Sequence, residues 1–516
     1  MSVVLWRADH VLSPGAVDAD AMRTVGERID WVGRYADADD GPDTVDLRGT
    51  VLTPAFVDGH VHATATGIAL DGLDLHAATS VADLLDRVAA HVRAHPGQIV
   101  RGTGWDESTW PERRAPSAAE LDRAGDGALV YLARADVHSA VVSSALLARC
   151  DLAGVDGVDA DGLLREDAHH VARRVVNDSL GAEQTQRAQL RTLRHAAALG
   201  VGAIHEMAGP EIAGLTDLES LLAVAASPGS ISVSAYWGAL GDVGTATRLG
   251  LVGAGGDLFC DGSIGSHTAA LHEPFADADT RGTLRFDTAE LAAHIAACAR
   301  AGVQSGFHVI GDAAVDAVLD AYDAALELLD EAGRAALRAG RHRLEHVEMA
   351  DAAAIARMVA LGLTASVQPA FDTEWGGPDL MYAARLGRDR GTGLNPFAAM
   401  HAAGVPLAFG SDSPVTAIDP WASVRGAVEH RTPISRLDVA TAFSAATRNG
   451  HRAVGRDDAG VLAPGQGATF AAWDSDSADA TLWAQLSELG HLEMAPGTPR
   501  CVRTVVDGVT IGGEVA

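Results

Sequence analysis

The sequence contains no lysine, so all 39 of its basic side chains other than histidine are arginines. Against them stand 69 acidic residues, which leaves a formal charge of -30. A surface with this negative excess repels phosphate backbones and anionic lipid head groups. The charge balance therefore argues against nucleic acids and membrane surfaces as partners.

Cysteine is scarce as well, and its four residues are far apart, with no CxxC pair among them. This spacing excludes a disulfide framework or a zinc knuckle and fits a reducing compartment. Long hydrophobic runs are also missing: no stretch reaches the roughly 18 apolar residues of a membrane span. The opening MSVVLWRADH has no apolar run long enough for a signal peptide. We therefore expect a cytoplasmic protein.

The composition is that of a folded chain, with 47% hydrophobic and 21% charged residues over 516 positions. Single cores rarely grow beyond about 250 to 300 residues, so two cores are expected. Residues 1–53 and 452–516 share brief apolar runs broken by polar turns, a pattern typical of short antiparallel strands. The two ends of the chain are therefore predicted to form one small β-sandwich domain.

Between the ends, residues 54–451 alternate apolar strand-like runs with Ala- and Leu-rich helical stretches, which predicts parallel strands joined by crossover helices. Eight strands are the number a closed (β/α)8 TIM-like barrel of α/β class requires. The predicted strands are 56–62, 201–205, 231–237, 257–261, 304–308, 343–346, 363–367 and 406–409. The stretch from about 64 to 195 is too long for one connection and is predicted to be an inserted subdomain over the site.

The strongest chemical signal is the run FVDGHVH at the end of the first predicted strand. Its two histidines, His60 and His62, are two positions apart, so both side chains face the same side of the strand. Both are expected to point inward at the mouth of the barrel, where they can bind one divalent ion.

Three further ionisable residues follow predicted strands directly: His308 in GFHVIGD, His346 in RLEHVE and Asp412 in LAFGSD. Ionisable groups are costly at such positions unless they are paired or bound to a metal. Four histidines and an aspartate at the same end of four strands therefore predict a shared metal site. Imidazole and carboxylate ligands suit Zn²⁺, with Fe²⁺ and Mn²⁺ as alternatives.

Seven segments along the chain form a set of motifs: TPAFVDGHVH, GWDESTWPERRAP, RADVHSAVVSSALL, LFCDGSIGSHTAAL, FHVIGDAAVDAVL, HRLEHVEM and FGSDSPV. Taken together and in this order, they resemble the amidohydrolase-3 group of the amidohydrolase superfamily, which includes N-substituted formamide deformylase-like enzymes. The resemblance implies a TIM-like barrel whose metal ligands come from strands one, four, five, six and eight. In this chain the implied ligands are His60, His62, His308, His346 and Asp412.

The fourth strand departs from the family pattern. Members with two metals usually carry a carboxylated lysine there, just ahead of the LF-x-DGS motif, and this chain has Asp257 at that position. No carbamate can form in a chain without lysine, so one ion and two ions both remain open. Asp261 is four residues further on and, if the segment is a strand, faces the same side. Either aspartate is a candidate for the carboxylate near the metal.

The expected reaction is hydrolysis of a non-peptide C–N bond, in an amide or an N-formyl or N-acyl amine, by metal-activated water. Asp412 is expected to accept the proton of that water and pass it to the leaving nitrogen, and His346 to hold a second ion or polarise the substrate. The alternatives are a deaminase of a cyclic amidine or nucleobase, a lactonase or phosphotriesterase-like esterase, and a non-catalytic binder with a decayed metal site.

The substrate is expected to be a small molecule with a hydrophobic acyl or aryl group, because such sites are largely apolar. Trp105 and Trp237 lie in or near the expected loops, and the family pattern places Asp106 and His138 in the insert. These four are the candidate substrate-binding residues. A homodimer is the default expectation for a soluble protein.

Overall fold

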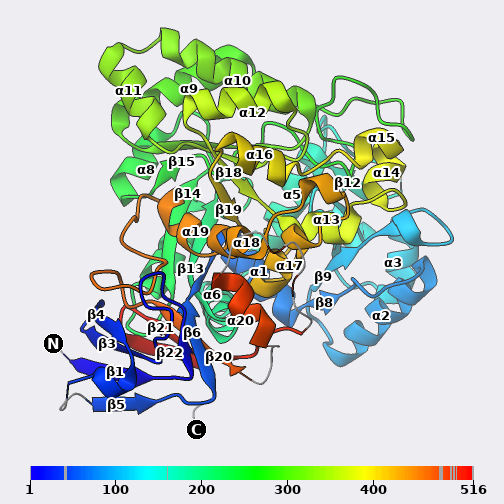
Figure 1. Ribbon diagram of the computed structural model, residues 1–516. Coiled ribbons are helices and arrows are strands. Elements are labelled where there is room, and N and C mark those ends of the chain that lie inside the picture. The colour runs from blue at the N-terminus through cyan, green and yellow to red at the C-terminus, as the bar shows by residue number, and fades with distance from the viewer. Residues whose placement is uncertain are drawn as a thin grey trace.

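The computed structural model describes residues 2–39, 43–159, 161–475, 480–487, 491, 494 and 497–513. Its largest sheet has eight strands, and every neighbouring pair in it is parallel. Figure 1 labels five of these strands, β13, β14, β15, β18 and β19. In sequence order the strands are β7 (Phe56–Val61), β13 (Val201–Ala208), β14 (Ser232–Trp237), β15 (Gly253–Ala254), β16 (Gln304–Val309), β17 (Arg343–His346), β18 (Thr364–Val367) and β19 (Leu407–Phe409). The predicted α/β barrel class is thus confirmed.

The barrel closes where the segment after β19 runs beside β7. The backbone N–H of Asp412 donates to the carbonyl of His60 at 2.8 Å, and the N–H of His62 donates to the carbonyl of Ser413 at 3.0 Å. Glycine makes this approach possible: a Cβ on Gly410 would lie 2.5 Å from the backbone nitrogen of His60. The same two hydrogen bonds place the first and last predicted metal ligands next to each other.

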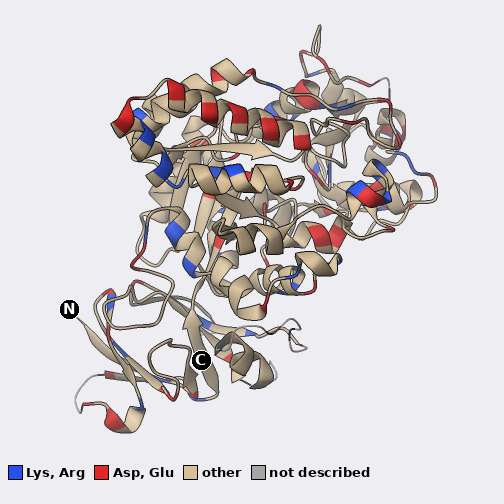
Figure 2. Cartoon of the chain, turned by 45° about the horizontal axis from the view of Figure 1, so that its top comes forward, with Lys and Arg blue, Asp and Glu red and all other residues tan. Residues whose placement is uncertain are grey.

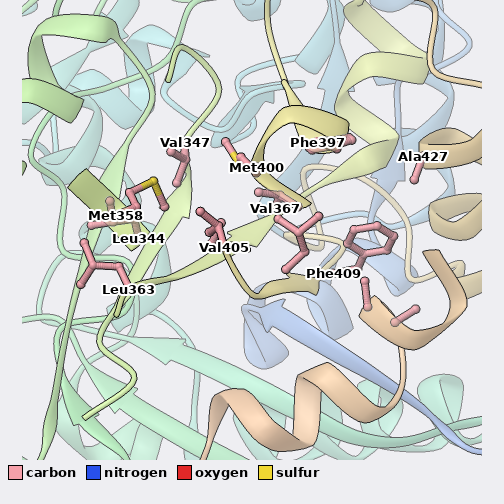
Figure 3. Packing of buried hydrophobic residues seen from close by; sticks show 14 of the residues in the cluster. Leu344, Val347, Met358, Leu363, Val367, Phe397, Met400, Val405, Phe409 and Ala427 are labelled. Atoms are coloured by element: carbon pink, nitrogen blue, oxygen red, sulfur yellow. The ribbon is translucent and has the colours of Figure 1, made fainter. Parts of the chain in front are cut away.

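Helices cover the outside of the barrel, and alternate strand residues point toward them. Leu344 of β17, Val367 of β18 and Phe409 of β19 pack with Met358 and Met400 of the surrounding helices (Figure 3). Full burial of each such side chain stabilises the fold by roughly 1.5 to 3 kcal/mol. The surrounding helices are α6 (Ala182–Ala198), α7 (Leu215–Ala225), α8 (Val243–Leu249), α9 (Thr288–Ala301), α10 (Asp312–Glu327), α11 (Glu331–Ala339), α12 (Ala352–Leu361), α16 (Phe397–Ala403), α17 (Pro420–Val428), α18 (Val439–Ala445) and α19 (Arg448–Ala453).

The fourth barrel strand lies earlier than the sequence predicts. It is the two-residue β15 (Gly253–Ala254), whereas residues 257–261 are irregular and join the sheet only through a bridge between Phe259 and His308. Gly255 and Gly256, with φ of +131° and +75°, turn the chain out of the strand. A Cβ on Gly255 would lie 2.3 Å from the carbonyl oxygen of Gly306, so a side chain there is excluded.

The chain between β7 and β13 forms a second sheet of five strands in the order β12-β11-β10-β9-β8. Its own core contains Leu84, Trp105, Trp110 and Leu132. These elements are α1 (Ala63–Asp71), β8 (Leu73–Asp74), α2 (Val81–Ala94), β9 (Val100–Trp105), η2 (Glu107–Thr109), α3 (Ala118–Gly125), β10 (Val130–Arg134), β11 (Ser139–Val142), α4 (Ser144–Leu147), β12 (Leu163–Arg165) and α5 (Glu166–Asp178). This sheet is the insert.

Both chain ends contribute to the sandwich, in which β20 pairs with β6 in antiparallel fashion. Trp6 and Phe470, from opposite ends of the chain, meet edge to face at 5.0 Å in its core. Two strand pairs, β1 with β5 and β2 with β6, are parallel, where the sequence predicted antiparallel strands throughout. The two sheets use β1 (Val3–Arg7), β2 (His10–Val11), β3 (Ala21–Val25), β4 (Arg28–Gly33), β5 (Asp43–Asp46), β6 (Thr50–Pro54), β20 (Phe470–Asp474), β21 (Cys501–Val506) and β22 (Val509–Gly513).

The negative excess is spread over the outer helices and loops of the barrel (Figure 2). Shorter helices complete the chain: η1 (Tyr35–Asp37), α13 (Pro369–Trp375), α14 (Met381–Leu386), α15 (Arg388–Gly391), η3 (Pro433–Ser435) and α20 (Ala480–Ser487). Among the described residues, no helix combines the length and the apolar character needed to cross a membrane.

Candidate metal centre and its cavity

Six ionisable side chains from five barrel strands and their following loops converge at one end of the barrel. We call them the ligand cluster: His60 on β7, His62 just after it, Asp257 after β15, His308 on β16, His346 at the end of β17 and Asp412 after β19. Their side chains are at most 12% exposed. Residues up to 352 positions apart in the sequence are thus neighbours, because parallel strands end at the same edge of the sheet.

One half of the ligand cluster consists of His60, His62 and Asp412. The Oδ1 atom of Asp412 lies 3.3 Å from Nε2 of His60 and 3.1 Å from Nε2 of His62. His60 Nε2 and Asp412 Oδ1 are both buried and have no hydrogen-bond partner. Buried polar atoms without partners are costly, and two imidazole nitrogens this close to a carboxylate oxygen suit a shared cation.

Asp257 lies between the two halves of the ligand cluster. Its Oδ2 is 3.9 Å from Nε2 of His60 and 3.6 Å from Nε2 of His62. Its Oδ1 is 3.0 Å from Nδ1 of His308 and 3.3 Å from Nε2 of His346. Although an aspartate side chain is shorter than a carboxylated lysine, the carboxylate of Asp257 faces both histidine pairs.

Asp261 has a different environment, because residues 257–261 do not form a strand. Its carboxylate accepts backbone N–H groups from Ile310 at 3.1 Å, Gly311 at 2.8 Å and Ala270 at 2.9 Å. These bonds tie the loop after β15 to the loop after β16. The same-face argument for Asp257 and Asp261 therefore does not apply. Of these two aspartates, Asp257 alone belongs to a group with metal-ligand geometry among the described residues.

A second layer of hydrogen bonds orients the histidine rings. Nδ1 of His60 contacts Glu345 Oε2 at 2.8 Å, Nδ1 of His62 contacts the carbonyl of Met207 at 3.0 Å, and Nδ1 of His346 contacts Gln368 Oε1 at 2.8 Å. Each contact leaves Nε2 free to face the centre of the cluster. Such partners fix the tautomer and raise the basicity of metal-binding histidines.

Arg343 holds Glu345 in place inside the barrel. It is fully buried, pairs with both carboxylate oxygens of Glu345, and donates to the carbonyl of Gly59 at 2.7 Å. Burial raises the pKa of Glu345, but the charge of Arg343 and the bond to His60 outweigh it and lower the pKa to about 2. Sequence reasoning missed both residues, although the charged Arg343 and Glu345 alternate within the strand RLEH.

The backbone is strained at two of the ligands. His346 has φ of +70° and Asp412 has φ of +55°, in the left-handed region that side chains other than glycine rarely adopt. Such conformations cost about 1 to 3 kcal/mol and persist where the surrounding structure enforces them. Here they turn the side chains of strand-end residues toward the ligand cluster.

The charges of the ligand cluster depend on one another. Burial raises the pKa of Asp412, but His60 and His62 outweigh it and hold the pKa well below its usual range. Burial lowers the pKa of His60, and Asp412 and Glu345 raise it well above its ordinary value. The contact between His60 and Asp412 therefore shifts the pKa values of the two residues in opposite directions.

The ligand cluster opens into a cavity of about 920 Å³ between the barrel and the insert, a volume that includes its open mouth. His62, Asp257, His308 and Asp412 line it from the barrel. From the insert come Arg101, Tyr131, His138 and Arg173, together with apolar side chains. A cleft lined mostly by apolar side chains with a few polar groups is typical of small-molecule sites.

Of the four predicted substrate-binding residues, the structure brings one to this cavity. His138 lines it with its ring 5.1 Å from that of His308, and burial together with His308 lowers its pKa to about 3. Trp105 is buried in the core of the insert and donates to the carbonyl of Leu132 at 2.9 Å. Asp106 pairs with Arg134 at 2.7 Å, and Trp237 donates to Asp242 at 2.9 Å.

The amidohydrolase family model matches residues 43–511, and the chain belongs to this family. Among its relatives, N-substituted formamide deformylase of Arthrobacter pascens is 26% identical over 95% of this chain and 94% of its own. The protein LONG AFTER FAR-RED 3 of Arabidopsis thaliana is 27% identical over 93% and 88%. The crystal structure of a metal-dependent hydrolase from Pyrococcus furiosus is 26% identical and superposes with a TM-score of 0.70, covering 92% of this chain and 99% of its own. The chain is a metal-dependent hydrolase that acts on a small molecule.

Proposed function

We propose that this protein hydrolyses a non-peptide C–N bond in an amide, such as an N-formyl or N-acyl amine. The observation that carries the proposal is the ligand cluster, whose inward-facing atoms include the buried and unpartnered His60 Nε2 and Asp412 Oδ1. The likeness to N-substituted formamide deformylase over nearly the whole of both chains supports an amide as the bond cleaved.

His60, His62 and Asp412 would hold one divalent ion, and His308 and His346 a second, with Asp257 between them. Zn²⁺ is the proposed metal, and Fe²⁺ and Mn²⁺ suit the same donor set. The two oxygens of Asp257 lie 3.0 to 3.9 Å from nitrogens of both histidine pairs, which favours two ions over one. Bound metal supplies a Lewis acid for the carbonyl oxygen and lowers the pKa of water.

Asp412 is the proposed proton carrier. Its carboxylate stays ionised because His60 and His62 keep its pKa low, so it can accept a proton from the attacking water. The same carboxylate then returns that proton to the leaving nitrogen. His346, whose Nδ1 contacts Gln368 Oε1 at 2.8 Å, would orient the carbonyl of the substrate or help to hold a second ion.

Two alternatives receive less support. A deaminase needs a carboxylic acid near the end of the fifth strand, and Asp312 there accepts the backbone N–H groups of His272 and Ala313 at 2.9 Å each. A non-catalytic binder with a decayed site would not be expected to retain the six converging side chains of the ligand cluster and the hydrogen bonds that orient its histidines. All four cysteines are free thiols, which supports the proposed cytoplasmic location.

The experiment is elemental analysis of the purified protein combined with hydrolysis assays on N-formyl and N-acyl amines. We expect two ions per chain, loss of turnover after dialysis against a chelator, and recovery on adding Zn²⁺. Well under one ion per chain in protein purified without chelator and offered Zn²⁺ would contradict the proposal. Release of ammonia from cyclic amidines without amide cleavage would favour the deaminase.

A further inference from the structure

Two arginines of the insert line the cavity together with the ligand cluster. Arg101 lies on β9 and Arg173 lies on α5, and both are partly buried at the cavity. The insert thus presents two arginines, and the barrel presents Asp257 and Asp412, to the same cavity. The arginine pair, as we call Arg101 and Arg173, has no role in the hydrolytic chemistry proposed above.

Neither arginine forms an ion pair with any carboxylate of the described ranges. Arg101 donates through Nη2 to Ser179 Oγ at 2.8 Å and to the carbonyl of Val176 at 3.2 Å. Arg173 donates through Nη2 to the carbonyl of Glu211 and contacts Nδ1 of His170 at 2.8 Å. The Nε atoms of both arginines are buried and have no hydrogen-bond partner. Each guanidinium therefore keeps unused donors.

Other buried arginines of this chain show how such a charge is normally compensated. Arg134 pairs with three carboxylates at 2.7 to 3.1 Å, and Arg343 pairs with Glu345. A buried guanidinium without an anion is costly, and burial lowers the pKa of Arg101 and Arg173 accordingly. In a chain with 30 surplus negative charges, two uncompensated arginines in the same cavity are conspicuous.

The nearby carboxylates are already engaged. Glu211, whose carbonyl accepts from Arg173, has its side chain 2.9 Å from Arg285. Asp257 attracts Arg173 electrostatically, but both of its oxygens face the histidines of the ligand cluster. A cation bound in the ligand cluster would offset Asp257 further, so the arginine pair would remain available to an outside anion.

We propose that the arginine pair binds a carboxylate of the substrate, so that the substrates are amides with an acid group, such as N-acyl amino acids. The proposal rests on the proposed function for the bond that is cleaved, whereas binding of the acid group requires no turnover. Planar guanidinium groups bind carboxylates in a bidentate manner. Ile68, Val176 and Phe259, which also line the cavity, would contact the apolar body between the acid and the amide.

Calorimetric titration with paired probes tests the proposal on the metal-loaded, full-length protein. N-benzoylglycine carries the acid on the amine side of the amide and N-phenylsuccinamic acid carries it on the acyl side, and each is compared with its neutral primary amide. We expect at least one acid to bind about tenfold to a hundredfold more tightly than its neutral partner, because hydrogen bonds to a charged group contribute about 1.5 to 3 kcal/mol.

The variants Arg173→Gln and Arg101→Gln should each remove most of this preference and leave binding of the neutral amide unchanged. Arg174→Gln is the matched control, because Arg174 is exposed and is next to Arg173 on the same helix. It removes the same charge from the protein and should leave the preference intact. Metal content and thermal melting of each variant report whether the fold and the ligand cluster are preserved.

The outcomes separate the two proposals. Tight binding of an acid that depends on Arg173, without cleavage of any amide, supports the arginine pair and contradicts the proposed reaction. Equal binding of acids and neutral amides to the wild-type protein overturns the arginine pair even if amides are cleaved. A preference that Arg174→Gln reduces as much as Arg173→Gln does would reflect overall charge, and it would also overturn the proposal.

Discussion

The ligand cluster and the arginine pair face one cavity, but they are built in opposite ways. In the cluster, histidine and carboxylate atoms face one another at 3.0 to 3.9 Å, and barrel residues behind them hold each ring. The arginines stand on the insert and keep donors without partners. The barrel thus provides ligands for a cation, and the insert provides donors for an anion. In our proposal the barrel residues carry out the reaction and the insert residues select the substrate.

The largest effect is expected from Asp412→Asn, which alters the ligand cluster and leaves the arginine pair in place. The amide cannot accept the proton of the attacking water, so kcat should fall by roughly 10²- to 10⁴-fold. Stopped-time hydrolysis assays measure the loss, and calorimetry with N-benzoylglycine should show unchanged binding. A near-normal kcat would show that Asp412 does not carry the proton.

Asp257→Asn should reduce the metal content from two ions toward one per chain, because the position between the histidine pairs loses its charge. Elemental analysis of the purified variant measures this. Asp261→Asn is the matched control: it weakens bonds to the backbone of Ile310 and Gly311, so it should lower thermal stability and keep both ions. Loss of an ion in Asp261→Asn but not in Asp257→Asn would show that Asp261, and not Asp257, supports metal binding.

Glu345→Gln tests the layer behind the ligand cluster. Gln keeps the size of the side chain but removes the charge that supports Nδ1 of His60, and metal affinity should fall about tenfold to a hundredfold. Competition with a fluorescent chelator gives the affinity. Exposed Glu374 offers the control substitution Glu374→Gln, for which no change is expected.

The smallest effect is expected at the contact between the insert and the barrel. Asp136 of the insert accepts the hydroxyls of Ser263 and Ser266, in the loop after β15, at 2.7 Å each. Burial raises its pKa, but Arg134 and these contacts outweigh that effect and lower the pKa to about 2, below the ordinary range of an aspartate. A depressed carboxylate pKa contributes stability above the unfolded value and loses it as the pH falls through the folded value.

Urea unfolding between pH 4 and pH 2 should therefore show wild-type stability falling by roughly 2 kcal/mol more than that of Asp136→Asn. Exposed Asp279 provides a control, because Asp279→Asn should follow the wild-type curve. Parallel curves for Asp136→Asn and the wild type would mean that this carboxylate does not stabilise the contact between insert and barrel.

Most of the ligand cluster could be predicted from the sequence, because its residues are marked by their spacing and by the apolar runs next to them. His60 and His62 are two apart on a strand, and His308, His346 and Asp412 each follow an apolar run. The fourth strand could not be placed this way, since LFCD has a strand-like composition although residues 257–261 are irregular. Only the fold shows that two glycines turn the chain there.

The insert side was harder to predict, because its contacts join distant residues of similar composition. Trp105 has the expected character of a pocket residue, but its indole N–H satisfies a carbonyl in the core of the insert. Arg101 and Arg173 are two among 39 arginines, and nothing in their local sequence distinguishes them. Only the folded structure shows that both arginines line the cavity and that neither forms an ion pair with a carboxylate of the described residues.

Asp257 has a consequence for how the enzyme matures. A carboxylated lysine forms only when dissolved carbon dioxide reacts with the side chain, so a site built on one depends on the supply of that gas. Asp257 carries its carboxylate from the moment of translation and already faces both histidine pairs. Reloading of the stripped protein with Zn²⁺ should therefore proceed equally well in degassed and in bicarbonate-rich buffer.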